Sequence, residues 1–591
     1  MRHQGSVKRR APAHGLRLSA MVFVLTTLLT LPARPATNDS PNANPGGISP
    51  LPIPSPLLDS PPALGDSVLP PLPTIGITDT QASLVVVERI VFEGNFAFND
   101  AELRDVVRPY LSRSLGESDL ITLRDQIAAH YQTAGYLATR VTLISSSATE
   151  GLLRVRVREG NLEDESCIRV LRPSAPAPLR DGACAPLAAS GRLRPEYVRA
   201  RLPGPEDGAL NINTLRTALT SLQGDERVQR LDAALTPGTG GDAKLDLLVW
   251  ETTPWRLSGE LGNTVSPSLG GLLGGATVEH LNLTGRGDAL SATVSASEGL
   301  FTAEGTYSRP VLGGRSRLVL AARGGWSEVV EAPFDALDLT GRTSTFELRL
   351  DVPVQGASPN RSLLLGFALV QRSSSAFVFG DPFAFTDGGD DGAYRLSIVR
   401  ASQSWLRRSA RQAIAWRSTF SVGTGLLEAT DRTQNGAPDG NFLAWRGQTQ
   451  WARTLPWRGT LLSVRGELQL AGDPLFGLEA FTLGGINSVR GYRENQLIRD
   501  SGISAGVEAQ IPVLRRGPHR LALAFFSDAG RVWDVGDEQE DALWSIGAGL
   551  RWEHPRVTVS LYAGQALSSR PTAEEGTLQD DGIHLSIRTA R

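Results

Sequence analysis

The chain has 591 residues, of which 41% are hydrophobic and 20% charged, and its formal net charge is −3. Because a single core stops growing at roughly 250 to 300 residues, this length predicts several domains. The slightly negative charge excludes an electrostatic basis for nucleic-acid binding, so we expect no nucleic-acid partner.

The N-terminus begins with basic residues, followed by an apolar run from Leu18 to Leu31 and by small residues around Ala33 and Ala36. This order predicts a secretory signal peptide over residues 1–36. A single membrane-anchoring helix is the alternative, but the run is shorter than the ~20 residues that a bilayer span needs. Residues 37–84 are rich in proline and serine and are predicted to form an extended linker.

Residues 85–163 have the pattern of one small α+β domain. Asn99 and Glu102 have the spacing of a capping box at a helix start. The predicted elements are a strand at 86–92, a helix from 99, a helix from 118 or 119 to 135, and strands at 136–144 and 152–157. This β-α-α-β-β order packs two helices on one face of a sheet.

Residues 164–254 repeat the same order more weakly, and we expect a second domain of this kind. Its predicted elements are a strand at 168–171, helices at 194–202 and 211–222, and strands at 228–235 and 244–251. Cys167 and Cys184 are the only two cysteines. In an oxidising compartment they are expected to form a disulfide, and two buried free thiols are the alternative.

Residues 255–591 show strict alternation of apolar with charged or polar residues. The segments 346–352, 414–420 and 462–470 each place an apolar row opposite an ionic or polar row, and all eleven tryptophans lie at or after Trp250. A lipid-facing surface opposite a wet lumen explains this pattern, with aromatics gathered at the membrane interfaces. A soluble antiparallel barrel or sandwich is the alternative.

Short polar turns alternate with longer connections along this region. Seven short turns on one side of the membrane predict sixteen strands, and long loops on the other side are typical of an outer-membrane barrel. The fold class is therefore mainly β, a 16-stranded antiparallel transmembrane barrel preceded by two small α+β domains. The short turns are expected at 284–288, 312–315, 355–360, 407–411, 455–459, 515–519 and 553–556, and the most prominent long loops at 373–392, 428–440 and 472–501.

Two short motifs fit this layout. The sixth long loop contains Val489-Arg490-Gly491-Tyr492, and the thirteenth strand contains Phe526-x-Asp528-x-Gly530. Both motifs, and the whole arrangement, resemble the outer-membrane transporters of two-partner secretion, within the outer-membrane assembly and secretion superfamily. The resemblance implies that the loop folds into the lumen.

The resemblance also implies that Arg490 pairs with Asp528. Physical chemistry supplies a reason, since an arginine in a confined lumen needs a matching carboxylate to offset its desolvation. The alternative is an arginine in a solvated surface loop and an unrelated lumen aspartate.

The two α+β domains resemble polypeptide-transport-associated (POTRA) domains, which in that family capture an unfolded exoprotein. An exposed sheet edge can add a strand from such a client. By analogy we place client binding on the strand 136–144 and the groove beside the second helix, although the same apolar residues are also typical of a core. The expected client-binding residues are Leu123, Ile127, Tyr131, Tyr136, Val141 and Leu143.

The resemblance implies a protein of the Gram-negative outer membrane, with its N-terminal domains in the periplasm. We expect it to export one large exoprotein of haemolysin or adhesin type, and to contact outer-membrane lipid, lipopolysaccharide and the barrel assembly machinery. We expect no enzymatic activity, no cofactor and no metal site, since no His-Glu-x-x-His zinc-protease motif and no Cys-x-x-Cys motif occurs. An assembly factor for other barrels, a barrel enzyme and a passive porin are the alternatives.

Overall fold

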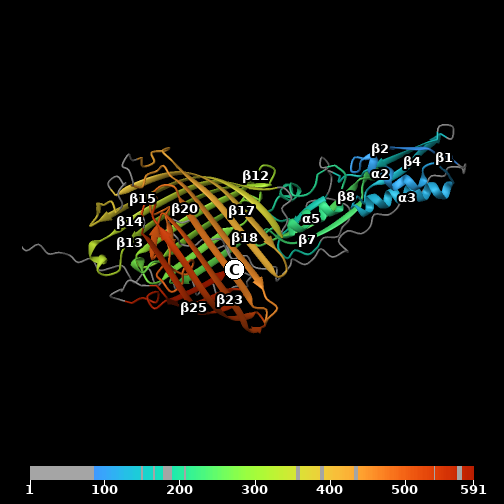
Figure 1. Cartoon of the computed structure of the whole chain (residues 1–591). Coiled ribbons are helices and arrows are strands. Elements are labelled where there is room, and N and C mark those ends of the chain that lie inside the picture. The colour runs from blue at the N-terminus through green and yellow to red at the C-terminus, as the bar shows by residue number, and fades with distance from the viewer. Residues whose placement is uncertain are drawn as a thin grey trace, which may run out of the picture.

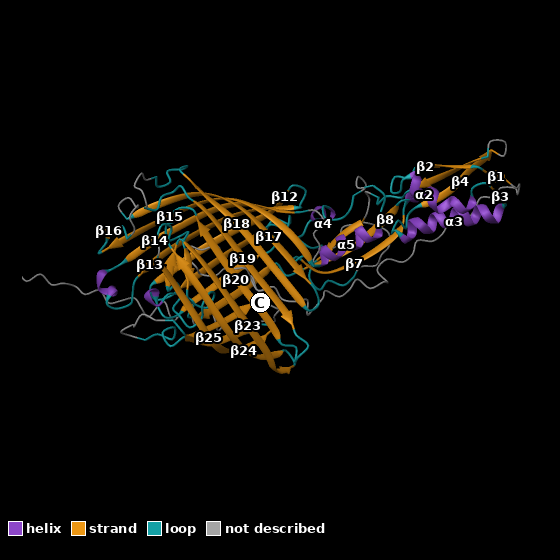
Figure 2. Ribbon diagram, in the orientation of Figure 1, coloured by secondary structure: helices purple, strands orange, loops and turns teal. Residues whose placement is uncertain are grey.

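The computed structural model describes residues 85–147, 151–163, 167–177, 190–204, 208–354, 360–385, 392–431, 437–537, 539–568 and 576–590. The predicted signal peptide and proline-rich linker lie outside these residues. Figure 1 shows two small domains in line, forming an arm that leaves one end of a large barrel. The long helices belong to the arm and the long strands to the barrel (Figure 2).

The first domain has the predicted β-α-α-β-β order, and its sheet runs β2-β5-β4. The Asn99 side chain accepts from the Ala101 and Glu102 amides while the Glu102 carboxylate accepts from the Asn99 amide, so the capping box is confirmed. The last two strands are antiparallel and the first is parallel to β5. The elements are β2 (Arg89–Glu93), α2 (Asp100–Val107), α3 (Glu117–Thr133), β4 (Arg140–Ser147) and β5 (Leu152–Arg158), with β1 (Val85–Val87) and β3 (Arg113–Leu115) as an additional two-stranded pair.

Several predicted boundaries in this domain were wrong. The strand expected at 86–92 is divided at Glu88 into β1 and β2, which belong to different sheets, and the second helix ends at Thr133 and not at 135. The second helix starts at Glu117, one or two residues before the predicted start at 118 or 119, because Gly116 occupies its N-cap position. The strand predicted from residue 136 begins only at Arg140, because residues 136–139 form a turn after α3. The turn follows from Gly135, whose φ of +100° ends the helix in a conformation that favours glycine.

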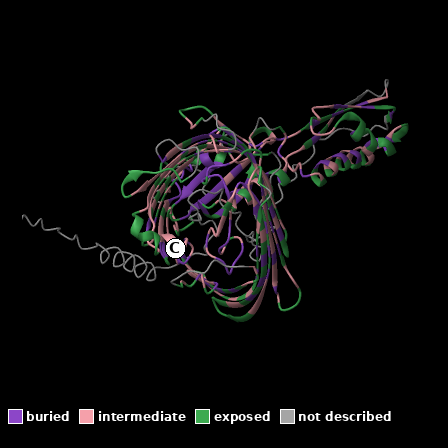
Figure 3. Cartoon of the chain, turned by 60° about the vertical axis from the view of Figure 1, so that its left-hand side comes forward, coloured by how far each residue is buried: buried purple, intermediate pink, exposed green. Residues whose placement is uncertain are grey.

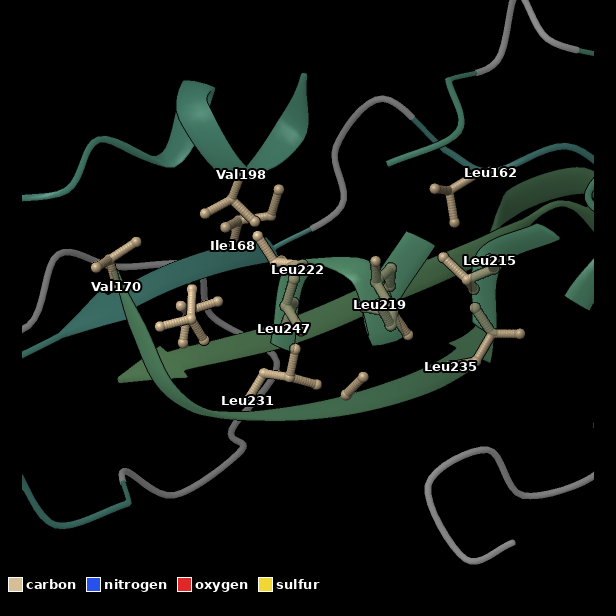
Figure 4. Close-up of a cluster of buried hydrophobic side chains, with 14 of the residues drawn as sticks. Leu162, Ile168, Val170, Val198, Leu215, Leu219, Leu222, Leu231, Leu235 and Leu247 are labelled. Carbon is tan, nitrogen blue, oxygen red and sulfur yellow. The ribbon is translucent and has the colours of Figure 1, made fainter. Parts of the chain in front are cut away.

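The second domain repeats this order, with its sheet running β6-β8-β7. Leu215, Leu219 and Leu222 recur at helical spacing along α5 and pack against Leu231 and Leu247 of the sheet (Figure 4). Cys167 is disulfide-bonded, and Cys184 lies outside the described residues. The elements are β6 (Cys167–Leu171), α4 (Pro195–Arg199), α5 (Ile212–Gln223), β7 (Val228–Pro237) and β8 (Ala243–Glu251).

Asn211 joins the two domains. Its side-chain oxygen caps the start of α5 through the Asn213 amide, while its side-chain nitrogen donates to the Ala134 carbonyl at the end of α3, at 3.0 Å. The Ile212 amide donates to the Gly135 carbonyl at 2.9 Å. One domain therefore satisfies helix-end groups of the other, which fixes their relative orientation.

Sixteen long antiparallel strands form a closed barrel in the described residues, as predicted, with β27 pairing with β9 to close it. The strands are β9 (Trp255–Gly262), β10 (Leu273–His280), β11 (Ala289–Ala296), β12 (Leu300–Val311), β13 (Ser316–Glu328), β14 (Thr340–Pro353), β15 (Arg361–Val378), β17 (Ala393–Arg408), β18 (Gln412–Thr424), β19 (Leu443–Thr454), β20 (Leu461–Ala471), β23 (Ser501–Arg516), β24 (His519–Trp533), β25 (Glu540–His554), β26 (Val557–Ala566) and β27 (Ile583–Ala590), and the two-residue β16 (Asp381–Pro382) lies between β15 and β17.

The alternation of the sequence corresponds to the two faces of the wall. On β14, Phe346 is 59% and Leu348 40% exposed on the outer face, whereas the side chains of Glu347 and Arg349 pair with each other at 2.6 Å on the inner face. Each of the seven predicted short turns joins neighbouring strands, although residues 355–359 of one turn lie outside the described residues. None of the helices in the described ranges is both long and apolar enough to cross a bilayer.

The second domain contacts the short-turn end of the barrel. The Arg194 amide donates to the Gly285 carbonyl at 2.8 Å, and Tyr197 packs so closely on Gly287 that a Cβ there would lie 1.9 Å from the ring. The Tyr197 hydroxyl donates to Asp225 at 2.6 Å, and Arg227 donates to that carboxylate and to the Leu281 carbonyl. The arm is thus held at the short-turn end of the barrel by these polar contacts, which we call the joint at Tyr197.

The surroundings of this joint favour the ionised form of Asp225 and the neutral form of Tyr197. Burial opposes the charge of Asp225, but Arg227 and the Tyr197 hydroxyl outweigh it and hold the pKa of this carboxyl below its usual range. Burial and the neighbouring Asp225 raise the pKa of Tyr197 to about 12. At neutral pH the joint therefore contains a carboxylate, a guanidinium and a neutral phenol.

Candidate functional site

The connection between β20 and β23, residues 472–500, folds into the barrel, and we call it the lumen loop. It carries its own two-stranded pair, β21 (Phe481–Leu483) and β22 (Leu497–Arg499). Phe476, Phe481 and Tyr492 are fully buried. Figure 3 shows buried segments inside the ring of strands. A loop with this much buried apolar surface occupies the lumen rather than solvent.

Arg490 lies at the centre of the lumen loop and is 3% exposed. Its Nε and Nη2 atoms donate to the two carboxylate oxygens of Asp528 on β24, at 2.7 and 3.1 Å, and its Nη1 donates to Glu508 on β23. Its own backbone amide also donates to Asp528, at 3.2 Å. This two-pronged geometry is the strongest form of arginine–carboxylate contact.

Further groups complete the surroundings of this ion pair. The Arg490 guanidinium carbon lies 3.7 Å from the centre of the Phe526 ring and 4.9 Å from that of Tyr562. Arg465 on β20 reaches Asp528 at 3.1 Å and also donates to the Ser488 carbonyl of the loop at 2.8 Å. Two cations and two carboxylates therefore balance one another in the lumen, which offsets the desolvation of each.

The remaining motif residues of the loop contact the last strands. Gly491 has a φ of +92°, and a Cβ there would lie 2.9 Å from the backbone of Gly564 on β26. Its amide donates to Nε2 of His584 on β27 at 2.9 Å. The Tyr492 hydroxyl accepts from the Ser568 amide at 2.9 Å, and Val489 packs beside Tyr492 in an apolar cluster. Only glycine permits this approach of the loop to the wall.

The strand motif gives the loop room. Phe526, Asp528 and Gly530 alternate along β24, so they share the inner face. A Cβ on Gly530 would lie 2.4 Å from the Leu483 side chain of the lumen loop. The glycine of this motif thus lets the loop lie against the strand, the aspartate binds it, and the phenylalanine stacks on its arginine.

A second anchor, which sequence reasoning missed, holds the start of the loop to a different part of the wall. Glu479 accepts from Arg372 on β15 at 2.8 Å and from Arg400 on β17 at 2.5 Å. The Phe476 ring stacks on Tyr394 with centroids 4.2 Å apart. These residues belong to separate strands with no common motif, and alternation marks only their inward direction. The lumen loop therefore bridges two sections of the wall.

The expected client-binding residues do not form one surface. Leu123, Ile127 and Tyr131 are fully buried, because they are the core face of α3 against the sheet. Val141 is also buried, whereas Tyr136 and Leu143 are half-buried. Leu123, Ile127, Tyr131 and Val141 pack together in the core between α3 and the sheet. The groove expected beside the helix is therefore filled by the domain's own core.

The edge itself is present. Among the described strands, β4 pairs with β5 alone, and its register shifts between Leu143 and Ser145. Its other side carries backbone groups available to a further strand.

Fold and loop together define a class: an outer-membrane β-barrel with periplasmic POTRA domains and a lumen occupied by one of its own loops. A family model described as haemolysin secretion/activation protein ShlB/FhaC/HecB matches residues 241–552, and a model of the ShlB-type POTRA domain matches residues 85–160. The chain belongs to the haemolysin secretion/activation protein family.

Similar proteins agree with this assignment. Outer membrane transporter CdiB of Dickeya dadantii (strain 3937) is 24% identical over 481 residues, 76% of this chain and 78% of the relative. The protein of the same description from Escherichia coli O6:K15:H31 (strain 536 / UPEC) is 26% identical over 536 residues, 83% and 80% of the two chains.

Solved structures show the same fold. The structure of CdiB from Escherichia coli superimposes with a TM-score of 0.65 at 19% identity, covering 88% of this chain and 92% of the other. That of CdiB from Acinetobacter baumannii gives a TM-score of 0.58 at 15% identity, covering 98% and 97%. The protein is an outer-membrane transporter of two-partner secretion, with its POTRA domains in the periplasm, and an exoprotein is its partner.

Proposed function

We propose that the transporter captures a large exoprotein of haemolysin or adhesin type at the edge of β4 and passes it, extended, through the barrel after the lumen loop is displaced. It acts as a conduit and not as an enzyme, and folding of the client outside drives export without ATP. The single observation that supports this best is the ionic bridge from Arg490 to Asp528 and Glu508. It holds the loop in the lumen through polar contacts that water can replace.

Capture at β4 rests on backbone chemistry. An extended client adds as a strand through main-chain hydrogen bonds, which do not depend on its sequence, while Tyr136 and Leu143 select its side chains. The bulge between Leu143 and Ser145 twists the strand and keeps the edge from pairing with copies of itself. The polar joint at Tyr197 holds the second domain at the barrel, and Asn211 joins that domain to the first domain, which carries this edge.

Passage requires that the loop leave the lumen. Its contacts with β23 and β24 include ion pairs and hydrogen bonds beside the packing of Leu483 on Gly530, and these polar contacts lose less free energy on hydration than apolar contacts of the same area would. The outward apolar belt contacts lipid, with lipopolysaccharide in the outer leaflet, and the barrel assembly machinery inserts the barrel.

The test of export is secretion of the exoprotein by cells that carry Arg490→Ala or the control Arg458→Ala, after each barrel is shown to be inserted. Arg458 is exposed in the short turn between β19 and β20. We expect loss of secretion with the first variant and normal secretion with the second. Equal secretion by both variants would exclude a role for the loop bridge.

The test of capture is site-specific photocrosslinking. A photoreactive residue at Thr142, exposed on β4, is expected to form an adduct with the exoprotein, whereas one at Arg104, exposed on α2, is not. Adducts at Arg104 and none at Thr142 would contradict capture at this edge.

A further inference from the structure

The barrel closes where its first and last strands meet, and in the described residues this seam is the shortest pairing between the sixteen long strands. β27 and β9 share five residue pairs, from Ser586 opposite Gly262 to Ala590 opposite Ser258. β9 and β10 share eight pairs, and β26 and β27 share seven. The residue pairs of the seam therefore end at Gly262, before the start of β27 at Ile583 is reached.

Side-chain amides continue the seam beyond that point. Asn263 is 1% exposed. Its Nδ2 donates to the Ile583 carbonyl at 2.8 Å, and its Oδ1 accepts from the Leu585 amide at 2.7 Å. Its backbone amide also donates to the Leu585 carbonyl, at 3.2 Å. The side chain thus pairs with β27 through one donor and one acceptor, as a backbone unit of a neighbouring strand does.

Gln579, in the loop between β26 and β27, binds the backbone on both sides of residue 264. It is 2% exposed. Its Nε2 donates to the carbonyls of Asn263 and Val265, at 2.9 and 2.7 Å. Its Oε1 accepts from the backbone amide of Glu494, at 2.8 Å. One side chain therefore joins the seam to the lumen loop, four residues beyond Arg490.

A neighbouring ion pair strengthens the same link. Arg493 of the lumen loop donates through two nitrogens to both carboxylate oxygens of Asp580, the residue after Gln579. Glu494 and Arg493 are thus bound by adjacent residues of one short segment. A displacement of the loop pulls on this segment, and the segment holds the outer end of the seam.

We propose that Asn263 and Gln579 form an amide latch, which closes the long-loop end of the β9–β27 seam and couples it to the lumen loop. Gln579 is a positioning residue for the loop, and Asn263 is its counterpart on the seam. Displacement of the loop during export releases the outer end of the seam, and a seam held shut retains the loop. The coupling is reciprocal, as any linkage between two equilibria must be.

Only amides satisfy this arrangement, since each of the two side chains donates and accepts. Gln579→Glu and Asn263→Asp keep the shape but place carboxylate oxygens against buried carbonyls. Asn441→Asp is the matched control, because Asn441 is exposed in the long loop between β18 and β19. Gln579→Leu tests loss of the hydrogen bonds without an added charge.

The first readout measures the seam. The full-length transporter in outer-membrane vesicles carries Leu261→Cys and Ile587→Cys, which face each other across the seam. The rate of disulfide formation under a fixed oxidant is expected to fall at least about fivefold with Gln579→Glu or Asn263→Asp, as loss of one buried hydrogen bond implies. Asn441→Asp is expected to leave it unchanged. Unchanged rates in both amide variants would overturn the latch.

The second readout measures the loop. Asn487→Cys lies on an exposed part of the lumen loop, and its labelling by a membrane-impermeant maleimide from outside reports loop position. Labelling is expected to rise with Gln579→Glu and Gln579→Leu. If the seam responds but labelling at this site does not, the residues only stabilise the barrel and the coupling is refuted.

The reciprocal measurement needs no destabilising variant. A protein that carries Leu261→Cys, Ile587→Cys and Asn487→Cys together is first inserted into the membrane. The cysteine pair across its seam is then oxidised or left reduced before the cysteine at position 487 is labelled. Slower labelling after the seam is locked supports the latch, and equal labelling contradicts it. No exoprotein is present, so the outcome is independent of the secretion and capture experiments.

Discussion

Arg490 and Asp528, separated by 38 residues along the chain, form a buried two-pronged ion pair between the lumen loop and the barrel wall. Asp528 also forms an ion pair with Arg465, and Arg490 also donates to Glu508. The pair is therefore part of a neutral four-charge cluster, and the effect of a substitution depends on which charge remains.

Arg490→Ala removes the cation that contacts both buried carboxylates, Asp528 and Glu508. We expect it to destabilise the docked loop by about 3 to 5 kcal/mol. Arg490→Lys keeps the charge but loses the two-pronged contact, so its effect should be smaller. The double variant Arg490→Ala with Asp528→Ala should be less harmful than the sum of the single variants. Pore conductance in planar bilayers measures loop docking, and additive effects would contradict the pairing.

Gly530→Ala tests the contact between strand and loop. The added Cβ would lie 2.4 Å from the Leu483 side chain, so the loop must shift, at a cost of about 1 to 3 kcal/mol. Gly305→Ala is the control, because no heavy atom lies within 4 Å of a Cβ added there. We expect higher conductance and earlier thermal unfolding only for the first variant, and equal behaviour of the two would argue against tight loop packing.

Glu479→Gln tests the second anchor. It leaves Arg372 and Arg400 close together without their shared carboxylate, so we expect about 3 to 5 kcal/mol less stable docking. Glu428→Gln removes a carboxylate from an ion pair whose members are exposed, and its effect should be below about 1 kcal/mol. Conductance, and heat resistance of the folded barrel in detergent gels, measure the effect of each variant. If Glu479→Gln changed neither quantity, the second anchor would be excluded.

The joint at Tyr197 should be insensitive to pH over a wide range. The pKa of Asp225 is lowered, so its contribution is present above the unfolded value near ~3.9 and is lost as pH falls through the lower folded value. The pKa of Tyr197 is raised to about 12, so its contribution is present below the unfolded value near ~10 and is lost as pH rises through about 12.

Asp225→Asn should remove this support, by about 2 kcal/mol or more, because Arg227 then stays buried without its partner. Asp232→Asn, at an exposed position of β7, is the control. Thermal unfolding followed by the helical circular dichroism signal reports the arm, and its midpoint should be constant between about pH 5 and pH 9 for the unchanged protein. A titration within that window would contradict the assignment of charges.

The barrel could be predicted because membrane strands obey a local rule. Phe346 and Glu347 point to opposite faces in any register, so alternation alone reported a wall with lipid on one side, and the turn lengths gave the strand number. The capping box at Asn99 was equally local. The turn at residues 136–139 was not predicted, because β propensity there is overridden by the way α3 ends at Gly135.

The candidate site likewise has a part that short-range sequence patterns predict and a part that they do not. Sequence by itself determined the membrane barrel, the two α+β domains, and the residue types that bring Arg490 and Asp528 into one motif set, since these depend on short-range patterns. Tertiary structure alone decided that Glu479 meets Arg372 and Arg400, that Leu123 and Ile127 are core, and that Asn263 and Gln579 close the seam. Those contacts join segments up to 322 residues apart, and closure of the barrel brings them together.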